Sequence, residues 1–111
     1  MAGKNYTETE VTHEEFKKII NNSEKVVVVN FFAEWCMPCL MMTPILEDIS
    51  ELMKEVSFVR INVDDNEDLA SKHNVSSVPC LIMFKNGKEM DRIIGSHSYD
   101  SIEMRIKRCM C

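Results

Sequence analysis

Two cysteines separated by two residues, Cys36 and Cys39, are the part of this sequence best suited to chemistry. They follow the apolar run Val26–Phe32 and precede a helical pattern, so Cys36 falls where a buried strand turns into a helix. A helix start presents unpaired N–H groups and a partial positive charge, which stabilise a thiolate, the nucleophilic form of cysteine. The spacing returns the second sulfur to bonding distance of the first, and Pro38 restrains the first turn. This context favours redox chemistry.

The cysteine pattern leaves other uses open. The same spacing occurs in half of a zinc site, and an inert buried pair is the plainest alternative. Cys36, Cys39, Cys109 and Cys111 could supply four thiolates to a metal ion, or two chains could bridge an iron–sulfur cluster. An odd number of cysteines, five, cannot all pair within one molecule. Cytosolic thiols mostly stay reduced, so clustered cysteines there indicate redox chemistry or metal before a structural disulfide.

Helices alternate with strands along the chain in the order βαβαβαββα. Helices that alternate with central strands, followed by a hairpin, predict an α/β fold with a mixed sheet and helices on both faces. Strands are expected at 6–11, 26–32, 57–63, 79–85 and 88–94, and helices at 12 to about 22, 36 to about 55, 64–73 and 98–108.

Four local signals support these elements. Thr12 and Glu15 form a capping box at a helix start. Val26–Phe32 has apolar residues on both alternating sets, which is typical of a central strand covered on both faces. Pro44 lies inside a helical pattern and should kink it. Asn86-Gly87 is a preferred two-residue hairpin turn.

Length and composition predict one globular domain over residues 1–111, with 45% hydrophobic and 28% charged residues. A formal charge of -5 argues against nucleic acid or an anionic membrane as the main partner. No apolar run is long enough to span a membrane. The first ten residues lack the apolar core of a secretory signal, so a complete chain is expected to be cytoplasmic.

Residues Phe31–Cys39, FFAEWCMPC, resemble the active site of the thioredoxin family, whose usual form is WCGPC. Pro44 matches the family's helix-kinking proline and Asp64 another typical position. Val78-Pro79 matches its cis-proline loop, and Gly95 the glycine that closes the active-site surface. These matches cover nearly the whole chain in the right order. The resemblance implies a thioredoxin fold, a central mixed sheet of four to five strands flanked by four helices.

The resemblance also implies a function, protein-disulfide reduction. Cys36 would attack a substrate disulfide, and Cys39 would resolve the mixed disulfide. Electrons would come from an external donor of the thioredoxin-reductase type, with no bound cofactor or metal. The partners would be disulfide-containing proteins, and a monomer is expected.

Several residues around the cysteines acquire supporting roles from the same resemblance. A cis bond is implied at Pro79, with the backbone of Val78 pairing with an extended substrate peptide. Trp35, Met37, Val78 and Gly95 would form an apolar docking surface; alternatively, Trp35 and Met37 are ordinary surface or packing residues. Asn30, Trp35, Pro38 and Pro79 are the expected site-supporting residues.

Two departures from the family pattern bear on the chemistry. Asn30 stands where the family usually has a buried Asp that takes or relays the proton of the second cysteine. An amide cannot accept a proton, but removing a carboxylate also removes a like-charge penalty on thiolates, so we expect slower resolution with Cys36 still nucleophilic. Alternatively, Asn30 only satisfies a buried strand position. Met37 replaces the usual Gly, and reference potentials for this fold, about -270 to -120 mV, leave reductant and oxidant open.

The remaining cysteines carry weaker expectations. Cys80 follows the cis-proline candidate; it is either a third thiol near the pair or, as we favour, a small buried filler. Cys109 and Cys111 end the chain, where termini are usually mobile, so both thiols are expected to be exposed; pairing with each other, cross-linking of two molecules, and a regulatory role are open. The three histidines lack ligand spacing, and the acidic run 64–68 lacks the glycine of a calcium loop. The competing functions are a disulfide oxidase or isomerase, a thiolate metal or iron–sulfur module, and a non-catalytic scaffold.

Overall fold

The computed structural model describes residues 6–8, 12–21 and 24–111, and their elements follow the expected order. The strands are β1 (Tyr6–Glu8), β2 (Val27–Phe32), β3 (Ser57–Asn62), β4 (Cys80–Lys85) and β5 (Lys88–Ile94); the helices are α1 (His13–Asn21), α2 (Met37–Leu52), α3 (Glu67–Lys72) and α4 (Tyr99–Met110). The rest of the strand expected at 6–11, and the end of the first helix at 22, lie outside the described residues.

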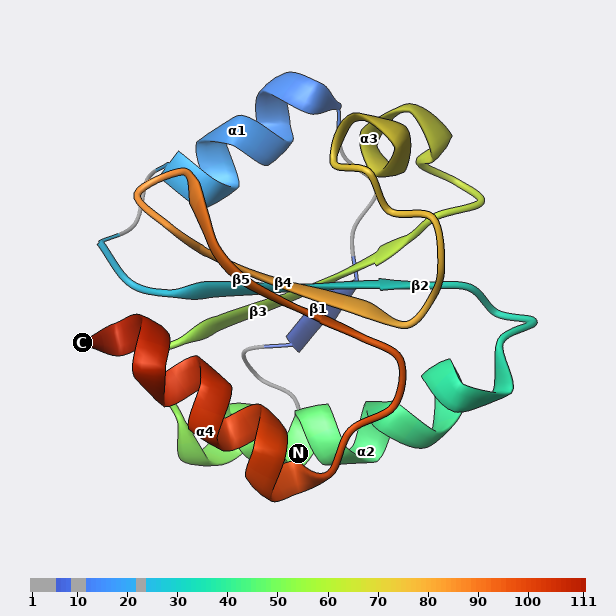
Figure 1. Cartoon of the computed structure of the whole chain (residues 1–111). Helices are drawn as coiled ribbons and strands as arrows, with labels where there is room; N and C mark the ends of the chain where they lie inside the picture. Colours follow the sequence, from blue (N-terminus) through green and yellow to red (C-terminus); the bar gives the residue numbers. More distant parts are fainter. Residues whose placement is uncertain (1–5, 9–11, 22–23) are drawn as a thin grey trace.

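The strands form one mixed sheet in the order β1-β3-β2-β4-β5. β1, β3 and β2 run parallel, and β2, β4 and β5 pair antiparallel. α1 and α3 cover one face, and α2 and α4 cover the other (Figure 1). β2 is therefore covered on both faces and buried at every residue, as its apolar sequence predicts. The expected fold class, a mixed sheet with helices on both faces, is confirmed.

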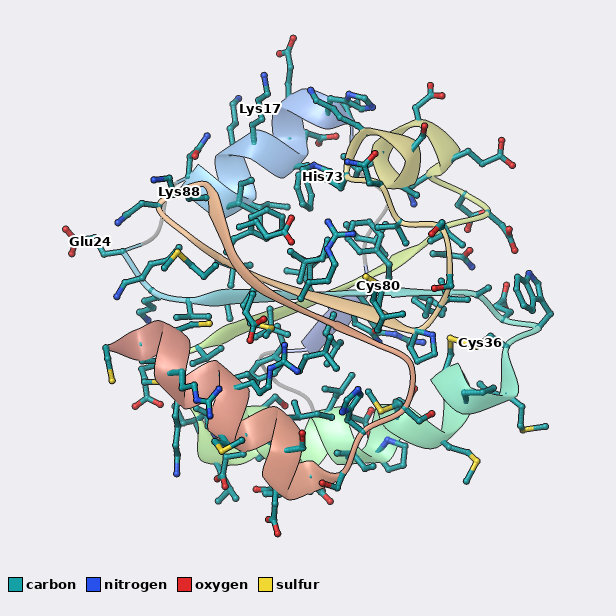
Figure 2. All side chains as sticks on the ribbon, viewed as in Figure 1. Lys17, Glu24, Cys36, His73, Cys80 and Lys88 are labelled. Carbon is teal, nitrogen blue, oxygen red and sulfur yellow. A yellow bond between two sulfur atoms is a disulfide. The ribbon has the colours of Figure 1, made fainter. Side chains whose placement is uncertain are left out.

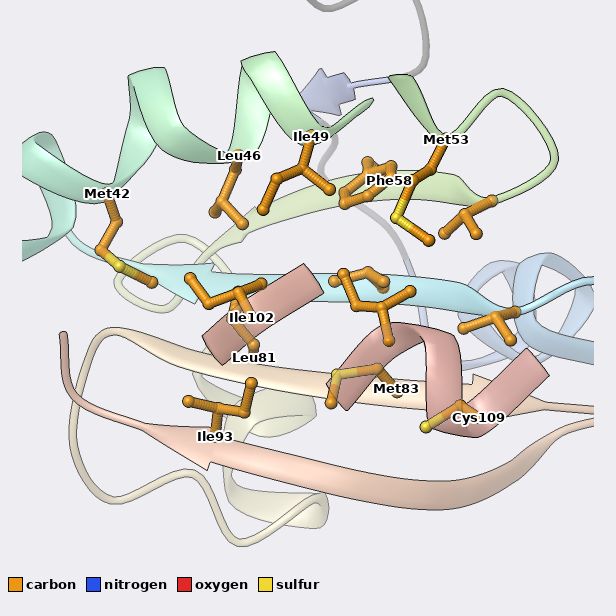
Figure 3. Close-up of a cluster of buried hydrophobic side chains, with 14 residues drawn as sticks. Met42, Leu46, Ile49, Met53, Phe58, Leu81, Met83, Ile93, Ile102 and Cys109 are labelled. Carbon is orange, nitrogen blue, oxygen red and sulfur yellow. The ribbon is translucent and has the colours of Figure 1, made fainter. Parts of the chain in front are cut away.

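The core on the α2 and α4 side is built from apolar residues at helical spacing. Met42, Leu46 and Ile49 of α2 point toward the sheet, and Ile102 and Cys109 come from α4 (Figure 3). Because these α2 residues lie three and four positions apart, they occupy one face of the helix. The opposite face of α2 is left in solvent.

The core on the α1 and α3 side packs against the other set of β2 side chains. Phe16 and Ile20 of α1 and Leu69 of α3 meet Val29 and Phe31 of β2. Successive strand residues alternate between faces, so β2 contributes to both cores.

Two predicted local motifs are confirmed by their hydrogen bonds and dihedral angles. The backbone N–H of Glu15 donates to Oγ1 of Thr12 at 3.1 Å, and that of Thr12 donates to Oε1 of Glu15 at 2.9 Å, which completes the capping box. At the hairpin turn, Asn86 and Gly87 have φ of 54° and 79°, as a type I′ turn requires.

Three helix boundaries differ from the prediction by two residues or more. α2 ends at Leu52 instead of about residue 55, because the chain turns back at Met53 toward β3. α3 begins at Glu67 instead of residue 64, because Asn62 holds the intervening turn: its Oδ1 accepts from the N–H of Asp64 at 2.9 Å. α4 continues to Met110, past the expected end at residue 108. Pro44 does lie inside α2, and the kink that it should cause stays a prediction.

Candidate active site

Cys36 lies between the carboxyl end of β2 and the start of α2. After β2 ends at Phe32, a short turn leads to Cys36, whose N–H donates to the carbonyl of Ala33 at 3.2 Å. Cys36 has extended backbone angles, φ -91° and ψ 106°, and is the N-cap of α2. Its sulfur accepts a hydrogen bond from the backbone N–H of Cys39 at 3.2 Å. The first turn of α2 thus directs a backbone N–H at this sulfur, as expected for a cysteine at a helix start.

Cys36 and Cys39 are joined as a disulfide, with their Cα atoms 5.3 Å apart. Their side chains are 4% and 2% exposed, in an apolar cluster with Phe32 and Ala33. Pro38 lies in the first turn of α2, where a missing N–H costs no helix hydrogen bond. The 5.3 Å between the Cα atoms lies within the range that a disulfide requires. Cys36 lies between the end of β2 and α2 (Figure 2).

The loop before β4 closes on the same sulfur. The Val78-Pro79 peptide bond is cis, as the family resemblance implies. The Cys36 sulfur lies 3.7 Å from the carbonyl oxygen of Val78, a distance at which a reduced thiol can donate a weak hydrogen bond. Gly95 donates its N–H to the carbonyl of Pro79 at 2.9 Å. Gly95 has φ of 86°, and a Cβ there would meet nothing within 4 Å, so the requirement for glycine is conformational.

Apolar side chains surround the disulfide at the surface. Trp35 is 73% exposed and Met37 64% exposed, whereas Val78 is half-buried. The indole N–H of Trp35 donates to Oδ2 of Asp64 at 2.9 Å, so the ring is held by the turn that follows β3. The expected docking residues Trp35 and Met37 flank Cys36 in the chain, and the carbonyl of Val78 lies 3.7 Å from its sulfur. Gly95 joins them through its hydrogen bond to Pro79, the residue after Val78.

Comparison with known proteins places this arrangement in a family. The family model described as thioredoxin matches residues 7–108. The chain belongs to the thioredoxin family.

Relatives and solved structures agree with this assignment. The chain is 40% identical over 93 residues to thioredoxin from Rickettsia bellii, and this alignment covers 83% of this chain and 89% of that protein. It is 41% identical over 83 residues to Thioredoxin-2 from Saccharomyces cerevisiae, with 75% and 80% covered. It is similar to thioredoxin NaTrxh from Nicotiana alata with a TM-score of 0.88 at 29% identity, covering 97% of this chain and 95% of that chain. With its bonded cysteine pair, the protein is a thiol–disulfide oxidoreductase.

Asn30, which replaces the usual aspartate of the thioredoxin family, is 1% exposed in the middle of β2. It pairs in register with Arg60 of β3 and Leu81 of β4. Because strand residues two apart share a face, Asn30 lies on the same side of the sheet as Phe32, which packs against the cysteine pair. The effect of this amide on the resolving step stays a prediction.

The three remaining cysteines lie in different environments. Cys80 is buried in the core between the sheet and α1 and α3, as expected of a filler, and burial raises the pKa of its thiol. Cys109 was expected to be exposed at the chain end, and this is wrong. α4 continues through Cys109 and buries its side chain in the core between the sheet and α2 and α4. Burial raises the pKa of its thiol. Cys111 is exposed, and its thiol donates to the carbonyl of Lys107 at 3.6 Å.

The four cysteines considered for a metal site do not converge within one chain. Cys36 lies at the sheet end opposite the C-terminus (Figures 1 and 2), while Cys109 is buried under α4. Over residues 6–8, 12–21 and 24–111, no three His, Cys, Asp or Glu side chains form a group that could hold a metal ion. Among the helices of the same ranges, none is long and apolar enough to cross a membrane.

Sequence reasoning missed two features of the site. The first is the hydrogen bond from Trp35 to Asp64, since nothing local links residues 29 positions apart. The second is the exposure of Leu40 and Met41, at 50% and 67%, on the outer face of α2. A signal for the second was present, because residues 35–46 contain no charged side chain.

Proposed function

We propose that this protein reduces protein disulfides, with Cys36 as the attacking cysteine and Cys39 as the resolving one. The observation that carries the proposal is the hydrogen bond from the N–H of Cys39 to the sulfur of Cys36 at the start of α2. This N–H and the helix dipole stabilise negative charge on the Cys36 sulfur.

The proposed cycle is two successive thiol–disulfide exchanges. The Cys36 thiolate attacks one substrate sulfur, a bond forms between them, and the other substrate sulfur leaves as a thiolate that takes up a proton. Cys39, once deprotonated, attacks the Cys36 sulfur and releases the first substrate sulfur as a second thiol. The substrate gains two electrons and two protons, and the protein is left with the Cys36–Cys39 disulfide.

We propose that substrate docks on Trp35, Met37, Val78 and Gly95, with Pro38, Pro79 and Asn30 supporting the site. The carbonyl of Val78 faces the Cys36 sulfur, so a peptide backbone held there would bring its own cysteine to the nucleophile. The exposed rings and thioether of Trp35 and Met37 offer apolar surface that a substrate segment can cover.

The cycle needs an electron source outside this chain. We propose a thioredoxin-reductase-type donor that returns two electrons and two protons to the disulfide, within electron transport that serves cell redox homeostasis. We also propose that the chain works in the cytoplasm as a monomeric single domain over residues 1–111. The unpaired thiols of Cys80, Cys109 and Cys111 suit a reducing compartment.

The test is insulin disulfide reduction driven by dithiothreitol, with wild type, Cys36→Ser and Cys39→Ser compared. Wild type should accelerate insulin precipitation, and Cys36→Ser should not. Cys39→Ser should accumulate a covalent complex with the substrate through Cys36, visible by mass spectrometry without reductant. No acceleration by folded, reduced wild type would reject the reductase direction, and a complex trapped by Cys36→Ser instead would reverse the two roles.

A further inference from the structure

The outer face of α2 is an uncharged apolar stripe that begins beside the disulfide. Met37, Leu40, Met41 and Pro44 are exposed, and they lie at positions i, i+3, i+4 and i+7 of one helix. This spacing places them along a single line on the helix surface. We call Met37, Leu40, Met41 and Pro44 the α2 stripe.

Packing of the helix does not explain the α2 stripe. The core face of α2 is formed by Met42, Leu46 and Ile49, which point into the sheet (Figure 3). At 100° per residue the α2 stripe lies on the opposite side of the helix from these residues. Exposed positions of α1 instead carry charges, as at Lys17 and Lys18. Apolar surface gathered on one exposed helix face marks an interaction site.

The α2 stripe is continuous with the redox site. The N–H of Leu40 donates to the carbonyl of Cys36 at 3.2 Å, so Leu40 lies one helical turn from the nucleophile. Trp35, which precedes Cys36 in the chain and is 73% exposed, adds further apolar surface. The stripe ends toward the middle of α2, because the next residue on its line is Asp48, which is exposed.

The length of the α2 stripe matches a short extended peptide. At 1.5 Å of rise per residue, Leu40 and Pro44 lie about 6 Å and about 12 Å along the helix from Cys36. An extended strand advances about 3.3 Å per residue. If a substrate cysteine is held at Cys36, the substrate residues about two to four positions from that cysteine would therefore lie over the α2 stripe.

We propose that the α2 stripe selects substrates by the apolar side chains that flank their disulfide, a selection that rests on the proposed reductase function. The occupant is a segment of a partly folded protein with large apolar side chains two to four residues from its cysteine. Burial of those side chains against Leu40 and Met41 stabilises the mixed disulfide and the transition state that leads to it. Methionine suits this role, because its flexible, polarisable side chain adapts to different apolar partners.

The test uses two synthetic peptides with the same disulfide loop and net charge. One carries Leu and Phe two to four residues from a cysteine, and the other carries Ser and Thr there. Wild type should show a higher kcat/KM for the apolar-flanked peptide. The double variant Leu40→Gln/Met41→Gln should lower kcat/KM for the apolar-flanked peptide about tenfold, a change of about 1.4 kcal/mol. In this variant the kcat/KM values of the two peptides should then be nearly equal. The matched control is Leu52→Gln, 70% exposed at the far end of the same helix, which should keep the wild-type ratio.

Other outcomes separate the selection from the reductase function. Equal rates for both peptides in wild type and in the double variant would overturn the selection and leave the reductase intact. Failure of folded wild type to reduce either peptide or a small aromatic disulfide would overturn the reductase function itself. Sedimentation that shows a wild-type dimer, converted to monomer by Leu40→Gln/Met41→Gln, would show that a second copy covers the α2 stripe and would overturn the proposed occupant.

Discussion

The indole N–H of Trp35 donates to Oδ2 of Asp64, 29 positions later in the chain, at 2.9 Å. The two residues belong to the turns that follow β2 and β3, which are parallel neighbours and end at the same edge of the sheet. Since Trp35 is 73% exposed, little packing holds its ring in place beside Cys36 in the chain. The carboxylate of Asp64 instead orients the ring from the neighbouring turn.

Asp64→Ala should loosen Trp35 without unfolding the protein. An exposed hydrogen bond of this kind contributes about 1 kcal/mol or less, so we expect a decrease of about two- to fivefold in kcat/KM for insulin reduction. Trp35 is the only tryptophan, so its emission reports the change directly. Asp64→Asn keeps an acceptor oxygen and should be milder. Wild-type rates and emission in Asp64→Ala would show that the bond does not position the ring.

Asn30→Asp should speed the resolving step. A carboxylate at this buried position in β2 can accept the proton of Cys39, which an amide cannot. The measurement is the rate at which a preformed mixed disulfide on Cys36 is released, followed by stopped flow between pH 6 and 9. Asn30→Leu, which offers no acceptor, is the matched control for packing. If Asn30→Asp is no faster than wild type over this range, Asn30 only fills a strand position.

The three unpaired cysteines should react with iodoacetamide at very different rates. Cys111 is exposed and should be alkylated first in the oxidised native protein. Burial excludes reagent from Cys80 and Cys109 and raises the pKa of both thiols, which lowers the thiolate fraction. Mass spectrometry of peptides over time measures the rates, with urea-unfolded protein as the reference in which all three react. Labelling of Cys109 as fast as Cys111 in native protein would contradict the burial of the α4 end.

His73 should make the protein less stable in acid. Its ring packs against Phe16 and Phe84, with centroids 5.0 and 5.7 Å away, and its pKa is lowered from 6.5, first by burial and then by Lys72. Arg92 and His13 lower this pKa further, and Glu89 opposes them. The unfolded chain therefore binds a proton on His73 more readily than the folded chain does. The contribution of neutral His73 to the free energy of unfolding is complete above about pH 6.5 and is lost as pH falls through the lower folded pKa.

Urea unfolding between pH 7.5 and 5 measures this effect. His73→Gln keeps a polar side chain but cannot titrate, so its free energy of unfolding should fall less over this range than that of wild type. His13→Gln, at the start of α1, is the control and should keep most of the wild-type slope. A His73→Gln slope equal to the wild-type slope would assign the acid sensitivity to other groups.

The sequence by itself determined the element order and the redox pair, because their signals are local. A capping box lies within one helical turn, a type I′ turn needs only Asn86 and Gly87, and the pattern of β2 marks a strand buried on both faces. Cys36 at a strand–helix junction is likewise readable from neighbours in the chain. These features depend on backbone geometry and side-chain periodicity over a few residues.

Only the tertiary structure decided which distant residues meet at the site and which thiols are accessible. The approach of Val78 to Cys36 joins residues 42 positions apart and was implied only by the family resemblance, not by any local pattern. That of Asp64 to Trp35 depends on the parallel register of β2 and β3. Cys109 is buried because α4 packs along the sheet past the predicted helix end. Such contacts follow from strand order and helix packing, which arise from many weak interactions along the whole chain and leave no mark in the local pattern.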